Sequence, residues 1–247
     1  MKKQYYIIFC AIFLISFSCA NINDSITELE EDIRIDELSD DQNSNPKNFK
    51  ILSLGDSYTI GERVCDACKF PEQLKDSLSK KFETDTTFTL KVIAKTGWTT
   101  SSLMSAIVNE NISNDYHLVT LLIGVNNQYQ GKNFSIYENE FPKLIATATK
   151  AVDNDKNKLI VISIPDYAFT PFGNGNTNIS EEIDKYNLFA KKYCEQNEIT
   201  FVNITDITRN GLTNPDLVAS DGLHPSKLAY TKFVERLLPF AIEKLKN

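Results

Sequence analysis

Histidine is scarce in this chain of 247 residues, which contains only His117 and His224. A metal centre built from several imidazoles is therefore excluded, and any mechanism that needs a histidine has two candidates. The nine glycines form neither a Gly-x-Gly-x-x-Gly run nor a Gly-x-x-x-x-Gly-Lys motif, so a nucleotide has no phosphate-binding loop. A Gly-x-Ser-x-Gly motif is also absent, which argues against an ordinary α/β-hydrolase. We expect neither a metal nor a cofactor.

An excess of positive charge is missing as well. The chain has 26 basic and 33 acidic side chains and a formal net charge of −7. A general nucleic-acid-binding surface is therefore not expected. With 42% hydrophobic residues and only eight prolines, the composition is that of a globular protein long enough for one large α/β domain.

The amino terminus predicts export. Lys2 and Lys3 precede an apolar run at residues 5–17, which Ser18 and Cys19 follow. As a helix this run is about 20 Å long, too short for a bilayer core of roughly 30 Å, so residues 1–18 are interpreted as a signal peptide. Its end resembles the lipobox of bacterial lipoproteins, which implies that Cys19 is lipidated and attaches an exported protein to a membrane of a bacterial cell envelope. A simple cleaved signal and a retained anchor are the alternatives.

Residues 19–48 are predicted to form an acidic, flexible tether. Residues 20–48 hold nine acidic side chains against two basic ones and no aromatic residue. A polar, charged segment of this kind cannot bury a core. A short amphipathic helix is the alternative, because the apolar residues recur at helical spacing; they are Ile22, Ile26, Leu29 and Ile33. The folded domain is predicted over residues 49–247.

Within that domain, strand and helix patterns alternate. Strands are predicted at residues 49–54, 88–94, 117–123, 159–164 and 200–204, and helices at 71–82, 100–109, 135–152, 179–195 and 225–246. Pro225 suits the first turn of the last helix. The alternation predicts an α/β fold, in which a five-stranded parallel sheet is covered by helices on both faces. Ligands bind outside the carboxyl ends of such strands, so the residues that follow each strand are the candidates for function.

Four motifs follow these strands: Gly55-Asp56-Ser57-Tyr58, Gly97, Gly124-Val125-Asn126-Asn127 and Asp221-Gly222-Leu223-His224. In these motifs the chain resembles the SGNH, or GDSL-type, hydrolases, which are serine esterases and acylhydrolases with a three-layer α/β/α, flavodoxin-like fold. The resemblance spans residues 49–240. It implies that Ser57 is the nucleophile, and that Ser57, Gly97 and Asn126 form the oxyanion hole.

The residue chemistry of the first and last motifs agrees with that resemblance. A serine hydroxyl is a poor nucleophile until a base takes its proton. Asp221 lies three residues before His224, so one loop can present a carboxylate to one ring nitrogen while the other nitrogen faces Ser57. Asp166 and Asp206, which follow later strands, remain alternative partners for His224. A turn serine and a solvent-facing histidine are the structural alternatives.

His117 is disfavoured as the base by its position. It opens the third predicted strand, about 23 Å from the end of that strand at 3.3 Å per residue. We therefore expect His117 at the opposite edge of the sheet, in a structural or surface role.

Aromatic residues gather after the strands and are expected around the mouth of the crevice. They are Tyr58, Trp98, Tyr129, Tyr167, Phe169 and Phe172. Five of them are candidate substrate-binding residues: Tyr58, Trp98, Tyr129, Phe169 and Phe172. Ordinary packing is the alternative. Asn127 and Asp56 are expected to support the site by hydrogen bonds rather than to act on the substrate.

The cysteines leave three interpretations open. Cys65 and Cys68 have the spacing of a redox motif but lack the sequence context of a thioredoxin site. In an exported protein a local disulfide is a reasonable alternative, and unpaired thiols are another. Cys194 is expected to be a buried small apolar residue.

Together these observations predict a serine-dependent carboxylic ester hydrolase that forms an acyl-enzyme on a small-molecule, glycan or lipid ester. Three alternatives are an O-acyl transferase acting on glycans, a non-catalytic carbohydrate- or lipid-binding module with a relic site, and a redox protein that uses Cys65 and Cys68.

Overall fold

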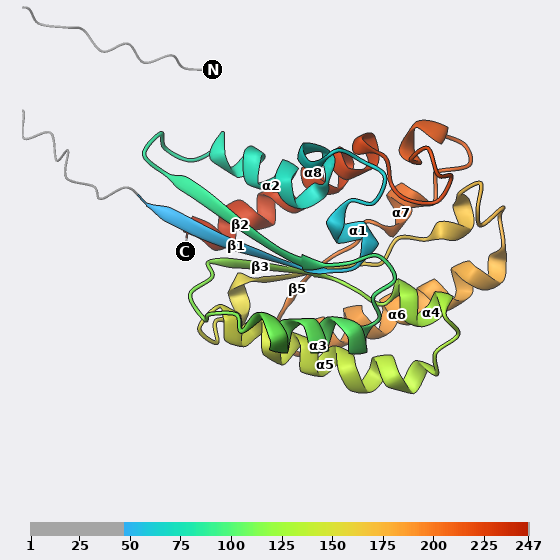
Figure 1. The fold of residues 1–247 in the computed structure, drawn as a ribbon, viewed down its shortest axis with the longest axis horizontal. Helices are drawn as coiled ribbons and strands as arrows, with labels where there is room; N and C mark the ends of the chain where they lie inside the picture. The colour runs from blue at the N-terminus through green and yellow to red at the C-terminus, as the bar shows by residue number, and fades with distance from the viewer. Residues whose placement is uncertain (1–46, 247) are drawn as a thin grey trace, which may run out of the picture. The chain divides into compact units, whose positions relative to one another are not determined.

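A parallel sheet lies at the centre of the computed structural model, which describes residues 47–246 (Figure 1). Its strand order is β2–β1–β3–β4–β5, and every pairing is parallel. The strands are β1 (Asn48–Gly55), β2 (Thr87–Ala94), β3 (Leu118–Leu122), β4 (Leu159–Ile162) and β5 (Thr200–Val202). The α/β fold and the five-stranded parallel sheet predicted from the sequence are confirmed.

Helices cover both faces of this sheet (Figure 1). They are α1 (Ser57–Ile60), α2 (Phe70–Ser79), α3 (Thr100–Glu110), α4 (Val125–Tyr129), α5 (Phe134–Ala151), α6 (Thr177–Gln196), α7 (Thr205–Thr208) and α8 (Lys227–Lys246). Helices α2 and α8 pack on one face, and α3, α5 and α6 lie on the other. Every residue of β3 and β4 is buried, which explains why these strands are apolar on both faces.

Four short 3-10 helices complete the regular structure of the described residues. They are η1 (Asp66–Cys68), η2 (Lys156–Lys158), η3 (Tyr167–Phe169) and η4 (Pro215–Leu217).

Three strands end level with one another, and this alignment determines where the loops lie. Gly55 at the end of β1 pairs with Ala94 of β2 on one side and with Leu122 of β3 on the other. The segments that follow these three strands therefore leave the sheet at the same edge. Each of them contains one of the motifs found in the sequence.

Some predicted boundaries differ from the structure. The last helix begins at Lys227 rather than at Pro225, because Pro225 pairs with Val218 in an isolated antiparallel bridge and Ser226 caps the helix through Ala229 N–H. Strand β4 ends at Ile162 rather than at residue 164. Beyond it the backbone N–H of Ile164 donates to the side chain of Asn187 instead of to a neighbouring strand.

Of the three interpretations of Cys65 and Cys68, the structure shows the local disulfide. Cys65 and Cys68 form a disulfide, and Cys194 on α6 is a buried free thiol. None of the helices in residues 47–246 has the length and apolar character needed to span a bilayer. The signal peptide, Cys19 and residues 19–46 of the predicted tether lie outside the described residues, and β1 begins at residue 48.

Candidate active site

Ser57 is the first residue of α1, at the point where the chain leaves β1. The Asp56 side chain caps this short helix by accepting a hydrogen bond of 3.0 Å from Tyr58 N–H. Glycine is required at position 55, because a Cβ atom there would lie 2.1 Å from Thr59 Oγ1 and 2.4 Å from Leu122 O. The turn therefore brings Ser57 close to the sheet edge, where its side chain is almost completely buried.

His224 lies in the loop before α8 and is held there by its neighbours. Its carbonyl oxygen accepts a hydrogen bond of 2.7 Å from Ala219 N–H, next to the Val218–Pro225 bridge. The ring nitrogen Nδ1 lies 2.6 Å from Asp221 Oδ2. A carboxylate at this distance favours the tautomer with the proton on Nδ1, which leaves Nε2 free to accept a proton.

The Asp221 carboxylate is itself fixed in place. Its Oδ1 atom accepts hydrogen bonds of 3.0 Å each from the backbone N–H groups of Leu223 and His224. Partial burial acts to raise the pKa of Asp221, but the hydrogen bonds from the His224 side chain and from these two N–H groups outweigh it and lower the pKa. Asp221 is therefore ionised at neutral pH and is oriented toward the imidazole.

A cavity of about 180 Å³ connects these segments. Its lining residues are Ser57, Tyr58, Thr96, Gly97, Val125, Asn126, Tyr129, Tyr167, Leu223 and His224. The predicted nucleophile, base and oxyanion donors thus share one cavity. Within residues 47–246 no hydrogen bond joins Ser57 Oγ to the His224 ring. Such bonds are often long in a free enzyme and shorten when substrate binds.

Asn126 and Gly97 line this cavity, where hydrogen-bond donors can stabilise negative charge. The side-chain nitrogen Nδ2 of Asn126 is buried without an acceptor at hydrogen-bond distance, although the Asn126 side chain lies near enough to the Asp56 carboxyl to act against the rise of its pKa. This nitrogen is a donor at the cavity wall. Gly97 has a φ of +82°, a conformation that favours glycine, and its carbonyl accepts a hydrogen bond of 2.8 Å from Gln130 Nε2. A Cβ atom at residue 97 would meet open space, so backbone conformation rather than close packing accounts for this glycine.

Asn127 supports the site from outside the cavity. Its Oδ1 atom accepts a hydrogen bond of 2.9 Å from Thr100 N–H, and its Nδ2 atom donates to Thr100 Oγ1 over 2.7 Å. These bonds connect α4 to the start of α3. Asn127 therefore lies between two helices and outside the lining of the cavity.

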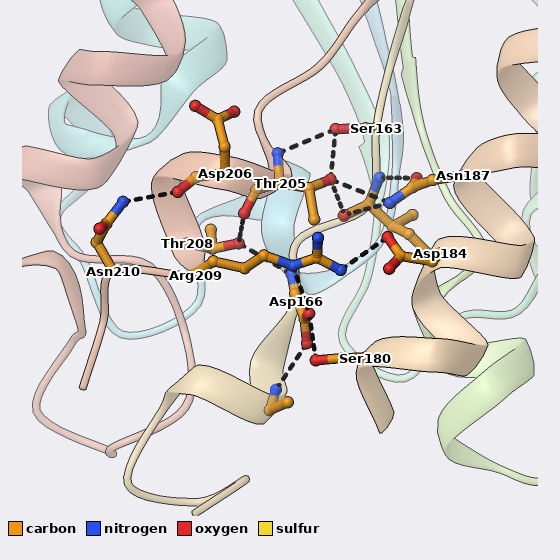
Figure 2. A network of polar contacts seen from close by, with 12 residues as sticks. Ser163, Asp166, Ser180, Asp184, Asn187, Thr205, Asp206, Thr208, Arg209 and Asn210 are labelled. Carbon is orange, nitrogen blue, oxygen red and sulfur yellow. Dashed lines mark hydrogen bonds and ion pairs between the residues drawn. The ribbon is translucent and has the colours of Figure 1, made fainter. Parts of the chain in front are cut away.

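The alternative carboxylates have other partners, and Figure 2 shows those of Asp166. Asp166 is completely buried and accepts hydrogen bonds from Ser180 Oγ at 2.7 Å and from Arg209 Nε at 2.9 Å. Asp206 pairs with Arg236, whose hydrogen bond lowers the pKa of Asp206. The carboxylate that contacts His224 is Asp221.

The other histidine lies at the opposite edge of the sheet, as expected. His117 Nδ1 accepts a hydrogen bond of 3.0 Å from Lys50 N–H, near the amino end of β1. Among residues 47–246 no cluster of three or more His, Cys, Asp or Glu side chains is arranged to hold a metal ion.

The candidate substrate-binding aromatics divide into two groups. Tyr58 and Tyr129 line the cavity, and Tyr167 lines it with them. Tyr129, Tyr167 and Phe172, here called the rim cluster, have ring centroids 6.0–6.2 Å apart, and Tyr129 and Phe172 are more than half exposed. Trp98, which packs against the core, Phe169 and Phe172 do not line this cavity, and Phe172 lies beside it through its contacts with Tyr129 and Tyr167.

A comparison with protein-family models identifies one family for this chain. The family model described as GDSL-like Lipase/Acylhydrolase matches residues 53–232. No curated protein matches the chain significantly. Among solved structures, a lipase/acylhydrolase from Enterococcus faecalis is 16% identical, with 80% of this chain and 96% of that chain covered and a TM-score of 0.60.

Two further solved structures are similar in the same way. The acetylxylan esterase Axe2 from Geobacillus stearothermophilus is 18% identical over 80% of this chain and 96% of that chain, with a TM-score of 0.57. A Clostridium thermocellum family 3 carbohydrate esterase is 19% identical over 81% of this chain and 98% of that chain, with a TM-score of 0.60. At these identities the likeness shows the fold.

The carboxyl group next to Ser57 predicts a pH dependence of stability. Asp56 is completely buried, and burial raises its pKa from 3.8 to about 7, although the Tyr58 N–H group favours the carboxylate. Between these two values the folded chain keeps a proton that the unfolded chain has released. The contribution of Asp56 to stability is therefore complete below about pH 4 and is lost as the pH rises through about 7.

Urea denaturation of the wild type and of Asp56→Asn between pH 4 and pH 8 measures this contribution. The free energy of unfolding of the wild type should decline relative to that of the variant as the pH rises, because the amide does not titrate. A difference that stays constant across this range contradicts the raised pKa.

Proposed function

Because the chain belongs to the GDSL-like lipase/acylhydrolase family and is a carboxylic ester hydrolase, we propose that Ser57, His224 and Asp221 are its catalytic triad. The observation that carries the proposal is the 2.6 Å contact between His224 Nδ1 and Asp221 Oδ2, on a histidine that lines the same cavity as Ser57. The burial and the unsatisfied Nδ2 atom of Asn126 support the assignment of this residue to the oxyanion hole.

In the proposed mechanism, Ser57 Oγ attacks the ester carbonyl while His224 Nε2 takes the hydroxyl proton. Asp221 stabilises the imidazolium that forms. Asn126 Nδ2 and the backbone N–H groups of Ser57 and Gly97 donate to the oxyanion. Collapse of the tetrahedral intermediate releases the alcohol, which receives the proton from His224. Water then attacks the acyl-enzyme by the same route and regenerates the Ser57 hydroxyl.

The kinetics of p-nitrophenyl acetate hydrolysis test these roles. Ser57→Ala and His224→Asn should each lower kcat by at least about 1,000-fold, since the triad acts as a unit. Asn126→Ala should lower kcat by roughly 100- to 1,000-fold, or about 3 kcal/mol, because one oxyanion donor is lost. His117→Asn is the matched control and should keep the wild-type kcat. Wild-type activity of Ser57→Ala refutes the nucleophile assignment.

The shape of the cavity supports a short acyl group. Its volume of about 180 Å³ is below the roughly 300–1,000 Å³ of pockets that enclose drug-sized ligands. The rim cluster offers exposed aromatic rings beside it, suited to a ring-shaped or apolar alcohol. Two similar structures are a carbohydrate esterase and an acetylxylan esterase, which supports sugar acetates among the substrates of this chain.

A panel of p-nitrophenyl esters with acetyl, butyryl and octanoyl groups, run alongside acetylated xylan, tests this substrate class. We expect kcat/KM to fall as the acyl chain lengthens, and Phe172→Ala to raise KM for the xylan more than for p-nitrophenyl acetate. A preference for octanoyl esters contradicts the short-acyl proposal.

The amino-terminal pattern supports a further proposal about location. We infer that the chain is exported and attached to a bacterial membrane through a lipid on Cys19, because a short apolar run ends at this cysteine. Replacement of Cys19 by Ala should move the protein from the membrane fraction to the soluble fraction. Equal membrane recovery of the two proteins contradicts lipidation of Cys19.

A further inference from the structure

The segment between α1 and α2 carries the disulfide and lies beside the active site. We call residues Glu62–Lys69 the disulfide loop; Cys65 and Cys68 are bonded within it. Cys65 is exposed, so an external thiol can reach it. The mechanism proposed above uses no residue of this loop.

The loop begins with hydrogen bonds to the nucleophile and to the oxyanion segment. The backbone N–H groups of Gly61 and Glu62 donate to the carbonyl oxygen of Ser57 over 3.1 and 3.0 Å. The Glu62 carboxylate accepts a hydrogen bond from Thr96 Oγ1. Thr96 lines the cavity and immediately precedes Gly97. Movement of Glu62 would therefore affect both the turn at Ser57 and the segment that contains Gly97.

Arg63, the next residue of the loop, approaches the carboxylate of Asp221. Arg63 Nε lies 3.9 Å from Asp221 Oδ2, the oxygen atom that contacts His224 Nδ1, and 3.7 Å from Glu62 Oε1. The Arg63 side chain is 62% exposed, so solvent screens its charge and the contact adds little stability. Any effect of Arg63 on the Asp221 carboxylate therefore depends on the position in which the loop holds the guanidinium group.

The backbone at Arg63 is strained. Its φ is +66°, in the left-handed region that L residues with a Cβ atom rarely adopt. Residues held in this region persist when the surrounding structure fixes them, and they cluster at functional sites. Here the strained residue is the one that contacts the catalytic carboxylate.

The far end of the loop is anchored on two helices. The carbonyl oxygen of Cys68 accepts a hydrogen bond from Gln73 Nε2 of α2, and Gln73 Oε1 accepts one of 2.8 Å from Thr231 Oγ1 of α8. The disulfide connects Cys65, two residues after Arg63, to this anchored position. Without the bond, Cys65 loses this cross-link and is connected to the anchored position only through the backbone.

From these contacts we propose that the disulfide loop positions the active site, with Arg63 as a positioning residue for Asp221, and that reduction of Cys65–Cys68 by a dithiol lowers turnover. This inference rests on the proposed triad. In the reaction a thiolate of the dithiol attacks one protein sulfur, which releases the other as a thiolate and gives a mixed disulfide. The second thiolate of the dithiol then attacks the dithiol sulfur of this mixed disulfide and releases the remaining protein thiolate. The dithiol loses two electrons and becomes a disulfide, while Cys65 and Cys68 become thiols.

The first experiment compares the oxidised and the dithiothreitol-reduced full-length protein with p-nitrophenyl acetate. We expect kcat to fall roughly three- to tenfold with KM little changed, less than the roughly 100-fold that a 1 Å misplacement can cost. Thiol titration should show that both cysteines are released, and circular dichroism should show an unchanged fold. Full kcat in reduced, folded protein overturns the proposal.

The double variant Cys65→Ser/Cys68→Ser is the matched control. It should have the kcat of the reduced wild type and show no response to dithiothreitol, because Cys194 is buried. A response of the same size in this variant would place the effect at another cysteine and overturn the proposal. If the variant fails to fold, the wild-type reduction followed by circular dichroism decides the question.

Variants of the charged loop residues test the role of Arg63. Arg63→Gln should lower kcat, and reduction should then have a smaller further effect, because both changes act on the same contact. Arg63→Lys should restore part of kcat. Asp66→Asn, at a completely exposed side chain of the same loop, should leave kcat unchanged.

Different results refute the proposed triad and the proposed role of the disulfide loop. An active Ser57→Ala variant refutes the triad whatever the disulfide does. An inactive Ser57→Ala variant together with insensitivity of the wild type to reduction refutes only the role of the loop.

Discussion

Parallel hydrogen bonding between β1 and β3 is the constraint on which the site depends. The register places Gly55 beside Leu122, so the segments that begin with Ser57 and with residues 124–127 leave the sheet together. These segments are far apart in sequence, and only strand pairing brings them to one cavity. A shift in this register would separate Ser57, the proposed nucleophile, from Asn126.

Asp221 and His224, the other half of the proposed site, come from the carboxyl-terminal part of the chain. Contacts within their own loop hold them in place. The bridge between Val218 and Pro225 closes a tight loop, within which Asp221 receives two backbone N–H groups and the imidazole. Because Asp221 and His224 share one loop, their relative geometry does not depend on the sheet. Their position relative to Ser57 does depend on it, through the packing of α8 beside α2.

Much of this arrangement could be predicted from the sequence. The apolar runs of β3 and β4 are typical of a sheet buried on both faces, and the spacing of Asp221 and His224 indicated a shared loop. The short helices α1, α4 and α7 could not be predicted, because four or five residues carry no helical periodicity. The packing of Trp98 against the core and the bridge at Pro225 are tertiary effects that no local pattern encodes.

Other features of the site could be located only in three dimensions. Nothing in the sequence links Arg63 to Asp221, since their contact crosses most of the chain. The pairing of Asp166 with Arg209 could not be predicted from the sequence either, and because of this pairing Asp166 is not the partner of His224. Gly97 was predicted as a site residue from its motif, but its φ of +82°, in the region that favours glycine, could be seen only in the structure.

In the proposed site, folding activates the hydroxyl of Ser57 through His224 and Asp221. Reaction of the folded full-length protein with a fluorophosphonate, followed by mass spectrometry of its peptides, is the sharpest test of this activation. We expect one phosphonyl group, attached to Ser57, and a labelling rate that falls sharply in His224→Asn. Labelling at another residue, or none in protein that still hydrolyses esters, would contradict it.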